Sequence, residues 1–198
     1  MPENNTPASD SDMQGILAFI KLAEQLKNTP RFSFTSEGKT ESAAEHSWRL
    51  CLLLMACGRF FPELDLERCF KIAIIHDLAE AECGDIPAIR TTEHKAKAAL
   101  EREAIKRILE PLPEFTQREM MEVWEEYESG VTNEALLVKA LDKLETLIQH
   151  NQGLNPPDFD YDFNVTYGLD FTGKTDFTER LRKLVDVETK SRIKACCR

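Results

Sequence analysis

Apolar residues recur at three- and four-residue spacing along most of the chain, which is the pattern of one face of an α-helix. The first such segment starts at Met13, and Thr29-Pro30 ends it because the residue before a proline disfavours helical backbone. Ser42-Ala-Ala-Glu45 has the form of a capping box and predicts the start of a second helix. Residues 48–57 of that helix are apolar on nearly every face, so we expect it to lie buried at the centre of the fold.

Capping residues and glycines mark further helices. Asp65 is a suitable N-cap for a helix that extends to about Glu82, and Gly84 fits the position that stops it. Four more helices are predicted. The first is capped by Thr91 or Thr92 and ended by Pro111, and the second extends from the capping box at Thr116 to Gly130. The third extends from Glu134 to His150 after a Thr132 or Asn133 cap, and the fourth from Asp176 to about Lys194.

Segments without helical periodicity separate these helices, and no stretch shows sustained strand alternation. Residues 31–40 and 154–174 are interpreted as ordered loops. The chain is therefore predicted to be all-α, a single domain with a bundle of about seven helices. The expected organisation is a flexible N-terminal tail at 1–12 and one domain at 13–198, with its core at 13–152 and a C-terminal loop and helix at 153–198.

The charge balance narrows the possible partners. The 198 residues carry a formal net charge of −10 and a sequence pI of about 5.0. An acidic surface repels phosphate backbones, so long nucleic acid is not expected as a partner, whereas a small phosphorylated molecule needs only a local cationic pocket. The six cysteines form no CxxC pair and no apolar stretch has the length of a membrane span. We expect a cytoplasmic protein with no membrane partner.

Histidines and carboxylates stand within the most apolar helical segments. His46 lies in the first turn of the helix from Ser42, and His76-Asp77 follows an apolar run. Asp142 is the one acid in another apolar run. Unpaired buried carboxylates are costly, and a divalent metal, whose natural protein ligands are imidazoles and carboxylates, offsets that cost. The four residues predict one metal site that leaves positions open for water and substrate.

Each of these residues taken alone is more often a hydrogen-bonded core residue than a ligand, and a His-Asp pair occurs often by chance. The combination at this spacing, each member in an apolar helical context, favours the metal site. The remaining histidines have structural interpretations. His94 lies in a charged stretch and is expected to be exposed, and His150 ends a helix where a cation complements the dipole.

Four segments together resemble the HD-domain superfamily, and more narrowly its 5′-deoxynucleotidase branch: Glu45-His46-Ser47, His76-Asp77-Leu78-Ala79-Glu80, Gly84-Asp85-Ile86-Pro87 and Leu141-Asp142-Lys143. The histidine and His-Asp signature is shared by several phosphohydrolase types. Glu80 and the segment 84–87 are the more specific part and point to the monophosphatase branch.

The resemblance implies a role for each site residue. His46, His76, Asp77 and Asp142 would hold one divalent metal ion, which could be Co, Mn, Zn, Fe, Ni or Mg. Glu80 would act as general acid or base, and Arg31 would orient the phosphate. Asp85 would contact the sugar, and the pocket would also include Phe32, where the family often has tryptophan, with Ile86, Pro87 and Ala88.

These roles predict an enzyme that removes the 5′-phosphate of (deoxy)nucleoside monophosphates. A phosphodiesterase or a dNTP triphosphohydrolase on the same metal centre is the alternative enzyme, and a nucleotide-binding regulatory protein without turnover is the alternative of another class. The presence of all four ligands and Glu80 argues against the regulatory protein. The apolar helical faces also lead us to expect a homodimer.

Overall fold

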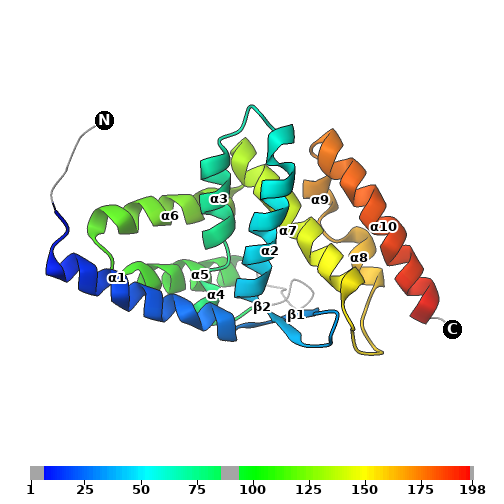
Figure 1. Ribbon diagram of the computed structural model, residues 1–198, viewed down its shortest axis with the longest axis horizontal. Coiled ribbons are helices and arrows are strands. Elements are labelled where there is room, and N and C mark those ends of the chain that lie inside the picture. Colours follow the sequence, from blue (N-terminus) through cyan, green and yellow to red (C-terminus); the bar gives the residue numbers. More distant parts are fainter. Residues whose placement is uncertain (1–6, 86–93, 197–198) are drawn as a thin grey trace.

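The computed structural model describes residues 7–85 and 94–196, which form a helical bundle with one small hairpin (Figure 1). The elements in chain order are α1 (Asp10–Ala23), η1 (Glu24–Asn28), β1 (Pro30–Phe34), β2 (Thr40–Ser42), α2 (Ala43–Cys57), η2 (Gly58–Phe60), α3 (Leu66–Ile75), α4 (Glu80–Cys83), α5 (His94–Leu109), α6 (Glu114–Ser129), α7 (Asn133–Gln152), α8 (Asp162–Thr166), α9 (Leu169–Thr172) and α10 (Asp176–Cys196). The all-α prediction is confirmed. No helix in the described part of the chain is long and apolar enough to cross a bilayer.

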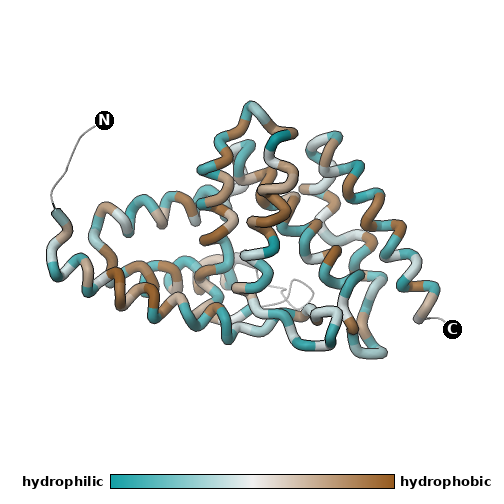
Figure 2. The backbone as a smooth tube through the Cα atoms, viewed as in Figure 1, coloured by the Kyte–Doolittle hydropathy of each residue, from teal (hydrophilic) through white to brown (hydrophobic). Residues whose placement is uncertain are grey.

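Helix α7 is the central element of the bundle. It packs against α2, α3, α6, α9, α10 and strand β1. Leu141, Leu144 and Leu147 of α7 are completely buried, as are Leu50 and Leu54 of α2. The apolar segments of α2 and α3 lie side by side in the middle of the molecule, while α1 runs along α5 at one end (Figures 1 and 2). The predicted central position of the second helix is therefore confirmed, but its predicted burial is only partly correct, because Trp48, Leu52 and Met55 on one face of it are exposed.

Several predicted helix ends are also confirmed. The Ser42 hydroxyl accepts a hydrogen bond from the Glu45 amide at 3.3 Å, and the Glu45 carboxylate accepts one from the Ser42 amide at 2.9 Å. The Asp65 and Thr132 side chains cap α3 and α7 by accepting the backbone N–H of Arg68 and of Ala135. Gly130 ends α6 with a left-handed φ of 57°, a conformation that glycine adopts without a steric cost.

Other predicted boundaries are wrong. The helix expected to extend to Glu82 ends at Ile75, and residues 76–79 form a tight turn before α4 begins at Glu80. Helix α6 begins at Glu114, next to Pro113, so the Thr116 motif lies inside it. The segment expected as a loop after Thr29-Pro30 contains the β1–β2 hairpin, and the 154–174 segment contains α8 and α9. Helix α1 begins at Asp10, capped by Ser9, and so three residues before Met13.

Candidate metal centre and adjoining cavity

Two helices and one turn bring the four predicted ligands together. His46 comes from the first turn of α2, His76 and Asp77 from the turn that follows α3, and Asp142 from the middle of α7. His46 Nε2 lies 3.0 Å from Asp142 Oδ1 and 3.8 Å from Asp77 Oδ2. His76 Nε2 lies 3.2 Å from Asp77 Oδ2 and 4.0 Å from Asp142 Oδ1. The four side chains therefore converge on one point through one atom each.

Hydrogen bonds fix the orientation of both imidazoles. His46 Nδ1 donates to the Glu145 carboxylate, and His76 Nδ1 donates to the Ala73 carbonyl oxygen at 2.9 Å. Both Nε2 atoms consequently face the shared point. Metal-binding histidines usually donate their second ring N–H to a carboxylate or a carbonyl in this manner, which orients the ring and raises its basicity.

Hydrogen bonds to Oδ2 also fix the orientation of the Asp142 carboxylate. Its Oδ2 accepts a hydrogen bond from the Tyr127 hydroxyl at 2.7 Å and one from Lys143 Nζ at 2.6 Å. Its Oδ1 is left facing His46. The Lys143 ammonium and the neighbouring His46 hold the pKa of Asp142 well below its usual range, although burial opposes the charged form. A carboxylate whose charged form is favoured in this way suits a cation.

The geometry and the donor set fit a divalent metal. Two ligand atoms that each lie about 2.1 Å from an ion are about 3.0 Å apart at right angles and about 4.2 Å apart across it. The four distances above fall in that range. His76 Nε2 is fully buried and makes no hydrogen bond, a cost that a bound cation would remove. The His46, His76 and Asp77 ligand atoms also lie within 4.8 Å of one another.

A second group of possible ligands adjoins the first. Glu41, His46 and Glu145 are all buried, with one ligand atom each within 4.8 Å of the others. This group offers the Nδ1 side of His46, whose proton already goes to Glu145. Arg31 lies 3.6 Å from Glu41 and Arg49 lies 3.2 Å from Glu145, so guanidinium groups already lie beside these acids. The first group is the better metal site.

Arg31 connects this centre to the space beside it. The residue lies in β1, and its guanidinium donates to Asp77 Oδ2 at 3.1 Å and to Thr146 Oγ1 at 3.2 Å. Burial disfavours its charge, but Asp77 and Asp142 outweigh that effect and raise the pKa of Arg31. A cation is therefore fixed next to the predicted ligands, where the sequence resemblance implied a phosphate contact.

Glu80 is the first residue of α4 and is almost completely buried. Its Oε2 makes no hydrogen bond, while its backbone carbonyl accepts one from Thr29 Oγ1 at 3.1 Å. Burial, followed by the nearby carboxylates of Asp77 and Asp85, raises the pKa of Glu80 to about 9. A carboxyl group in this condition is suited to transferring a proton near neutral pH.

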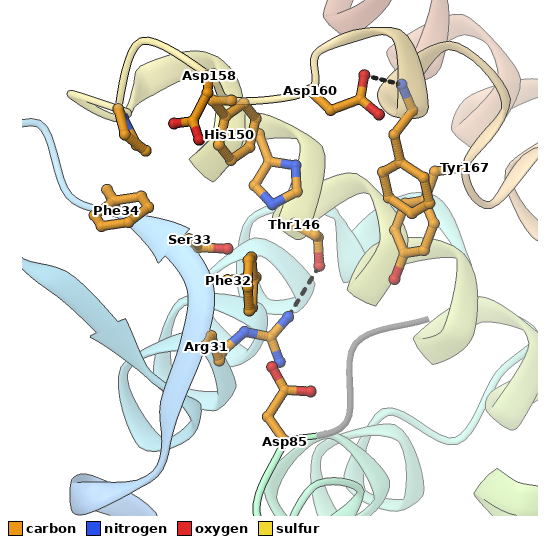
Figure 3. Close-up of a pocket in the computed structure, with 13 residues that line it drawn as sticks. Arg31, Phe32, Ser33, Phe34, Asp85, Thr146, His150, Asp158, Asp160 and Tyr167 are labelled. Atoms are coloured by element: carbon orange, nitrogen blue, oxygen red, sulfur yellow. Dashed lines mark hydrogen bonds between the residues drawn. The ribbon is translucent and has the colours of Figure 1, made fainter. Parts of the chain in front are cut away.

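A cavity of about 320 Å³ opens beside Arg31 (Figure 3). Asp85 and Phe32 both line it, so these two predicted pocket residues lie together. The other predicted pocket residues, Ile86, Pro87 and Ala88, lie outside the described residues. Further lining residues come from α7 and from the segment that follows it: Thr146, His150, Pro156, Asp158, Phe159, Asp160, Phe163 and Tyr167.

Several of the surrounding residues were not anticipated from the sequence. Glu145, Thr146 and His150 follow Asp142 at three, four and eight positions, so they share its face of α7. That periodicity was available in the sequence. His150 is not a charged helix end, because burial lowers the pKa of its imidazole and Nδ1 donates to Asn164 Oδ1 at 2.9 Å.

A family model described as HD domain matches residues 23–182. The chain belongs to the HD-domain family. The resemblance seen in the sequence motifs is thereby confirmed, and the matched segment includes every predicted site residue.

Named relatives agree with this assignment. The chain is 35% identical over 147 residues to the mouse protein named 5′-deoxynucleotidase HDDC2, covering 73% of each chain. It is 37% identical over 140 residues to the Schizosaccharomyces pombe protein named 5′-deoxynucleotidase hdd1, covering 68% of this chain and 70% of the relative. A Magnetospirillum magnetotacticum structure, described as a predicted metal-dependent phosphohydrolase, superposes with a TM-score of 0.80 at 23% identity, covering 95% of this chain and 96% of that one. The similarity to this solved structure supports the fold of the chain.

Proposed function

We propose that the chain is a metal-dependent phosphohydrolase that removes the 5′-phosphate of (deoxy)nucleoside monophosphates. The observation that carries the proposal is the convergence of His46, His76, Asp77 and Asp142 on one point, with a fixed arginine and a cavity directly beside it. The relatives named 5′-deoxynucleotidase support the same reaction.

The four ligands would hold one divalent ion, and such an ion supplies Lewis-acid stabilisation of phosphate oxygens and makes water a stronger nucleophile. Arg31 binds and orients the phosphate, because its guanidinium is the fixed cation beside the ligands. Water attacks phosphorus, the bond to the 5′ oxygen breaks, and the products are the nucleoside and inorganic phosphate. Glu80 transfers the proton to the leaving 5′ oxygen or takes it from the attacking water, and its raised pKa favours the first role.

The proposed position of the nucleoside part of the substrate rests on the cavity. Asp85 lines it next to Arg31, so a nucleotide whose phosphate lies at Arg31 places its sugar near Asp85 (Figure 3). An ionised carboxylate accepts hydrogen bonds and repels phosphate, so Asp85 serves a sugar hydroxyl. Phe32 lines the same space, and Ile86, Pro87 and Ala88 complete our proposed set of pocket residues.

Phosphate release from a panel of nucleotides tests this function. The panel contains ribo- and deoxynucleoside mono-, di- and triphosphates and a phosphodiester, each with Co, Mn, Zn, Fe, Ni or Mg. We expect turnover of monophosphates and its loss, together with bound metal, in Asp77→Ala. Exclusive turnover of triphosphates or diesters would support the alternative enzymes on the same centre. Metal-loaded protein that binds nucleotides without turnover would support the regulatory alternative.

We also propose that the protein acts in the cytoplasm as a homodimer. Trp48, Leu52 and Met55 form an apolar stripe on α2 and are 62%, 45% and 64% exposed. Three large apolar side chains at helical spacing on one exposed face suit contact with a second copy. Light scattering of the purified protein and of a Met55→Glu variant tests the dimer, and cell fractionation tests the compartment.

A further inference from the structure

The part of the cavity formed by the end of β1 and the segment after α7, here called the aromatic end, is built from aromatic side chains. One of them, Tyr167, also lies close to the predicted metal ligands, since its ring centroid is 5.4 Å from Nζ of Lys143, which binds Asp142. Phe34 comes from β1, Phe159 from the segment after α7, Phe163 from α8, and Tyr167 follows α8. The rings of Phe163 and Tyr167 lie 4.9 Å apart, and those of Phe159 and His150 lie 4.9 Å apart. Flat apolar walls of this kind accept a flat heteroaromatic ring, because stacking of a base on aromatic side chains stabilises binding.

Helix α7 sets the order of groups between the ligands and this aromatic end. Asp142, Thr146 and His150 lie four residues apart on one helical face. The α-helix rises about 1.5 Å per residue, so His150 stands about 12 Å along the axis from Asp142, with Thr146 and its bound Arg31 about half-way. The phosphate, sugar and base of a mononucleotide follow one another over a comparable length. The cavity volume of about 320 Å³ is within the range of small-molecule sites.

His150 and Asp158 place hydrogen-bond acceptors at the aromatic end. His150 Nδ1 donates to Asn164 Oδ1, which leaves Nε2 of the neutral ring as an acceptor, and the ring projects into the cavity (Figure 3). Asp158 lines the same end, is exposed, and makes no hydrogen bond or ion pair with the other described residues. Asp160 also lines it, but one of its oxygens already accepts from the Asp162 and Phe163 amides at 3.0 and 3.2 Å.

We infer that this aromatic end is a nucleobase subsite in which His150 and Asp158 accept hydrogen bonds from N–H groups on the base edge. The inference rests on the proposed nucleotidase function and extends it to base selection. Guanine, adenine and cytosine each present an exocyclic amino group, and guanine adds a ring N–H beside it. Thymine and uracil present one ring N–H flanked by two carbonyl oxygens, which repel a carboxylate. The subsite therefore favours amino-bearing bases over thymine and uracil.

The first experiment compares kcat/KM for dGMP, dAMP, dCMP and dTMP in the wild type and in Asp158→Asn. The substitution keeps the side-chain shape, removes the charge, and adds an N–H that can donate to a thymine carbonyl. We expect the wild type to favour the three amino-bearing substrates over dTMP, and Asp158→Asn to narrow that preference by about tenfold, the effect of one charged hydrogen bond.

Two controls isolate the base contact. Asp162→Asn makes the same charge change at a nearby exposed position that does not line the cavity, so it should keep the wild-type base preference. Deoxyribose 5-phosphate carries the phosphate and sugar without a base, so its kcat/KM should be equal in the wild type and in Asp158→Asn. An unchanged base preference in Asp158→Asn, or an equal loss for deoxyribose 5-phosphate, would overturn the subsite.

A binding measurement separates failure of the subsite from failure of the nucleotidase function. Calorimetric titration with deoxyguanosine and thymidine, which carry no phosphate, requires no turnover. We expect tighter binding of deoxyguanosine, weakened about tenfold by Asp158→Asn or His150→Leu and unchanged in Asp162→Asn. Nucleoside binding without phosphate release would contradict the nucleotidase function and keep the subsite. Turnover of nucleotides with no nucleoside discrimination would contradict the subsite alone.

Discussion

The Glu145 carboxylate accepts the Nδ1 proton of His46 inside the bundle, so that Nε2 of the same ring faces Asp142 at 3.0 Å. Arg49 lies 3.2 Å from the other Glu145 oxygen and fixes the carboxylate in turn. Glu145 and Arg49 therefore determine which nitrogen of His46 is available to a cation.

Replacing Glu145 by glutamine should weaken metal binding. The amide is nearly the same shape but a poorer acceptor, so His46 becomes less basic and its orientation less fixed. Loss of such an outer partner typically lowers metal affinity about 10–100-fold. Titration of the metal-free protein with Zn²⁺ or Mn²⁺ measures the change, with Glu122→Gln on the exposed side of α6 as the matched control. Equal affinities in the wild type and Glu145→Gln would contradict this relationship.

Glu80→Gln should separate proton transfer from metal binding. The substitution keeps the size of the buried side chain and removes its titratable proton. General acid–base help is worth about 10²–10⁴-fold, so kcat should fall by that factor while metal content stays at the wild-type level. Metal analysis and steady-state kinetics on the same preparation make the comparison, and exposed Glu37→Gln controls for the charge change. An unchanged kcat in Glu80→Gln would show that Glu80 has a structural role instead.

Arg31→Ala should weaken the phosphate contact. Hydrogen bonds to charged groups contribute about 1.5–3 kcal/mol, which corresponds to about a 10- to 150-fold loss in kcat/KM. Inhibition by inorganic phosphate should weaken by a similar factor, whereas metal should remain bound. Arg59→Ala, at an exposed position on η2, removes the same charge as a control. Wild-type phosphate inhibition in Arg31→Ala would show that the phosphate binds elsewhere.

Glu41 should make the stability of the metal-free protein depend on pH. Burial, followed by the neighbouring Glu145 carboxylate, raises its pKa from 4.5 to about 7. The folded state therefore holds the proton more tightly than the unfolded chain. The stabilisation from this difference is fully present below the unfolded pKa and is lost as pH rises through the folded value of about 7.

Glu41→Gln keeps the neutral form at every pH. Between pH 5 and 7 its free energy of unfolding should rise relative to the wild type by up to about 1.4 kcal/mol per pH unit. Urea unfolding of chelator-treated protein across that interval measures the difference, and exposed Glu63→Gln is the control. A wild-type minus variant difference that is constant with pH would show that Glu41 does not titrate there.

Local signals explain why much of the fold and the ligand set could be predicted from the sequence. The Ser42, Asp65 and Thr132 caps act within one helical turn, and the apolar runs around His46, His76 and Asp142 report burial directly. The break after Ile75 could not be predicted, because Leu78, Ala79 and Glu80 are all good helix formers. A distant contact accompanies the break, since Thr29 Oγ1 donates to the Glu80 carbonyl at 3.1 Å.

The hairpin and the cavity walls depend on contacts between distant parts of the chain. Strand β2 has three residues, too few for a readable alternation, and the Phe34 carbonyl at the end of β1 accepts a hydrogen bond from Gln149 of α7 at 2.5 Å. The aromatic residues after α7 line the cavity because this segment folds back toward β1 (Figure 3). Such placements are set by packing, and periodicity alone carries no information about them.

Asp85 should govern the choice of sugar. Its carboxylate lines the cavity beside Arg31, and burial raises its pKa, an effect that the Arg31 charge opposes. A carboxylate that accepts a sugar hydroxyl at close range leaves little room for an additional 2′-hydroxyl, so we expect kcat/KM for dAMP to exceed that for AMP.

Asp85→Ala should lower kcat/KM for dAMP by about tenfold, because one charged hydrogen bond is lost, and should bring the dAMP and AMP values closer together because the crowding is relieved. Asp85→Asn keeps the crowding and replaces one acceptor oxygen by a donor group, so it should retain more of the discrimination than Asp85→Ala. Metal content should be equal in all three proteins, since Asp85 is not among the converging ligands. Equal kcat/KM values for dAMP and AMP in the wild type would contradict the exclusion of the 2′-hydroxyl. An unchanged kcat/KM for dAMP in Asp85→Ala would contradict the contact between Asp85 and the sugar.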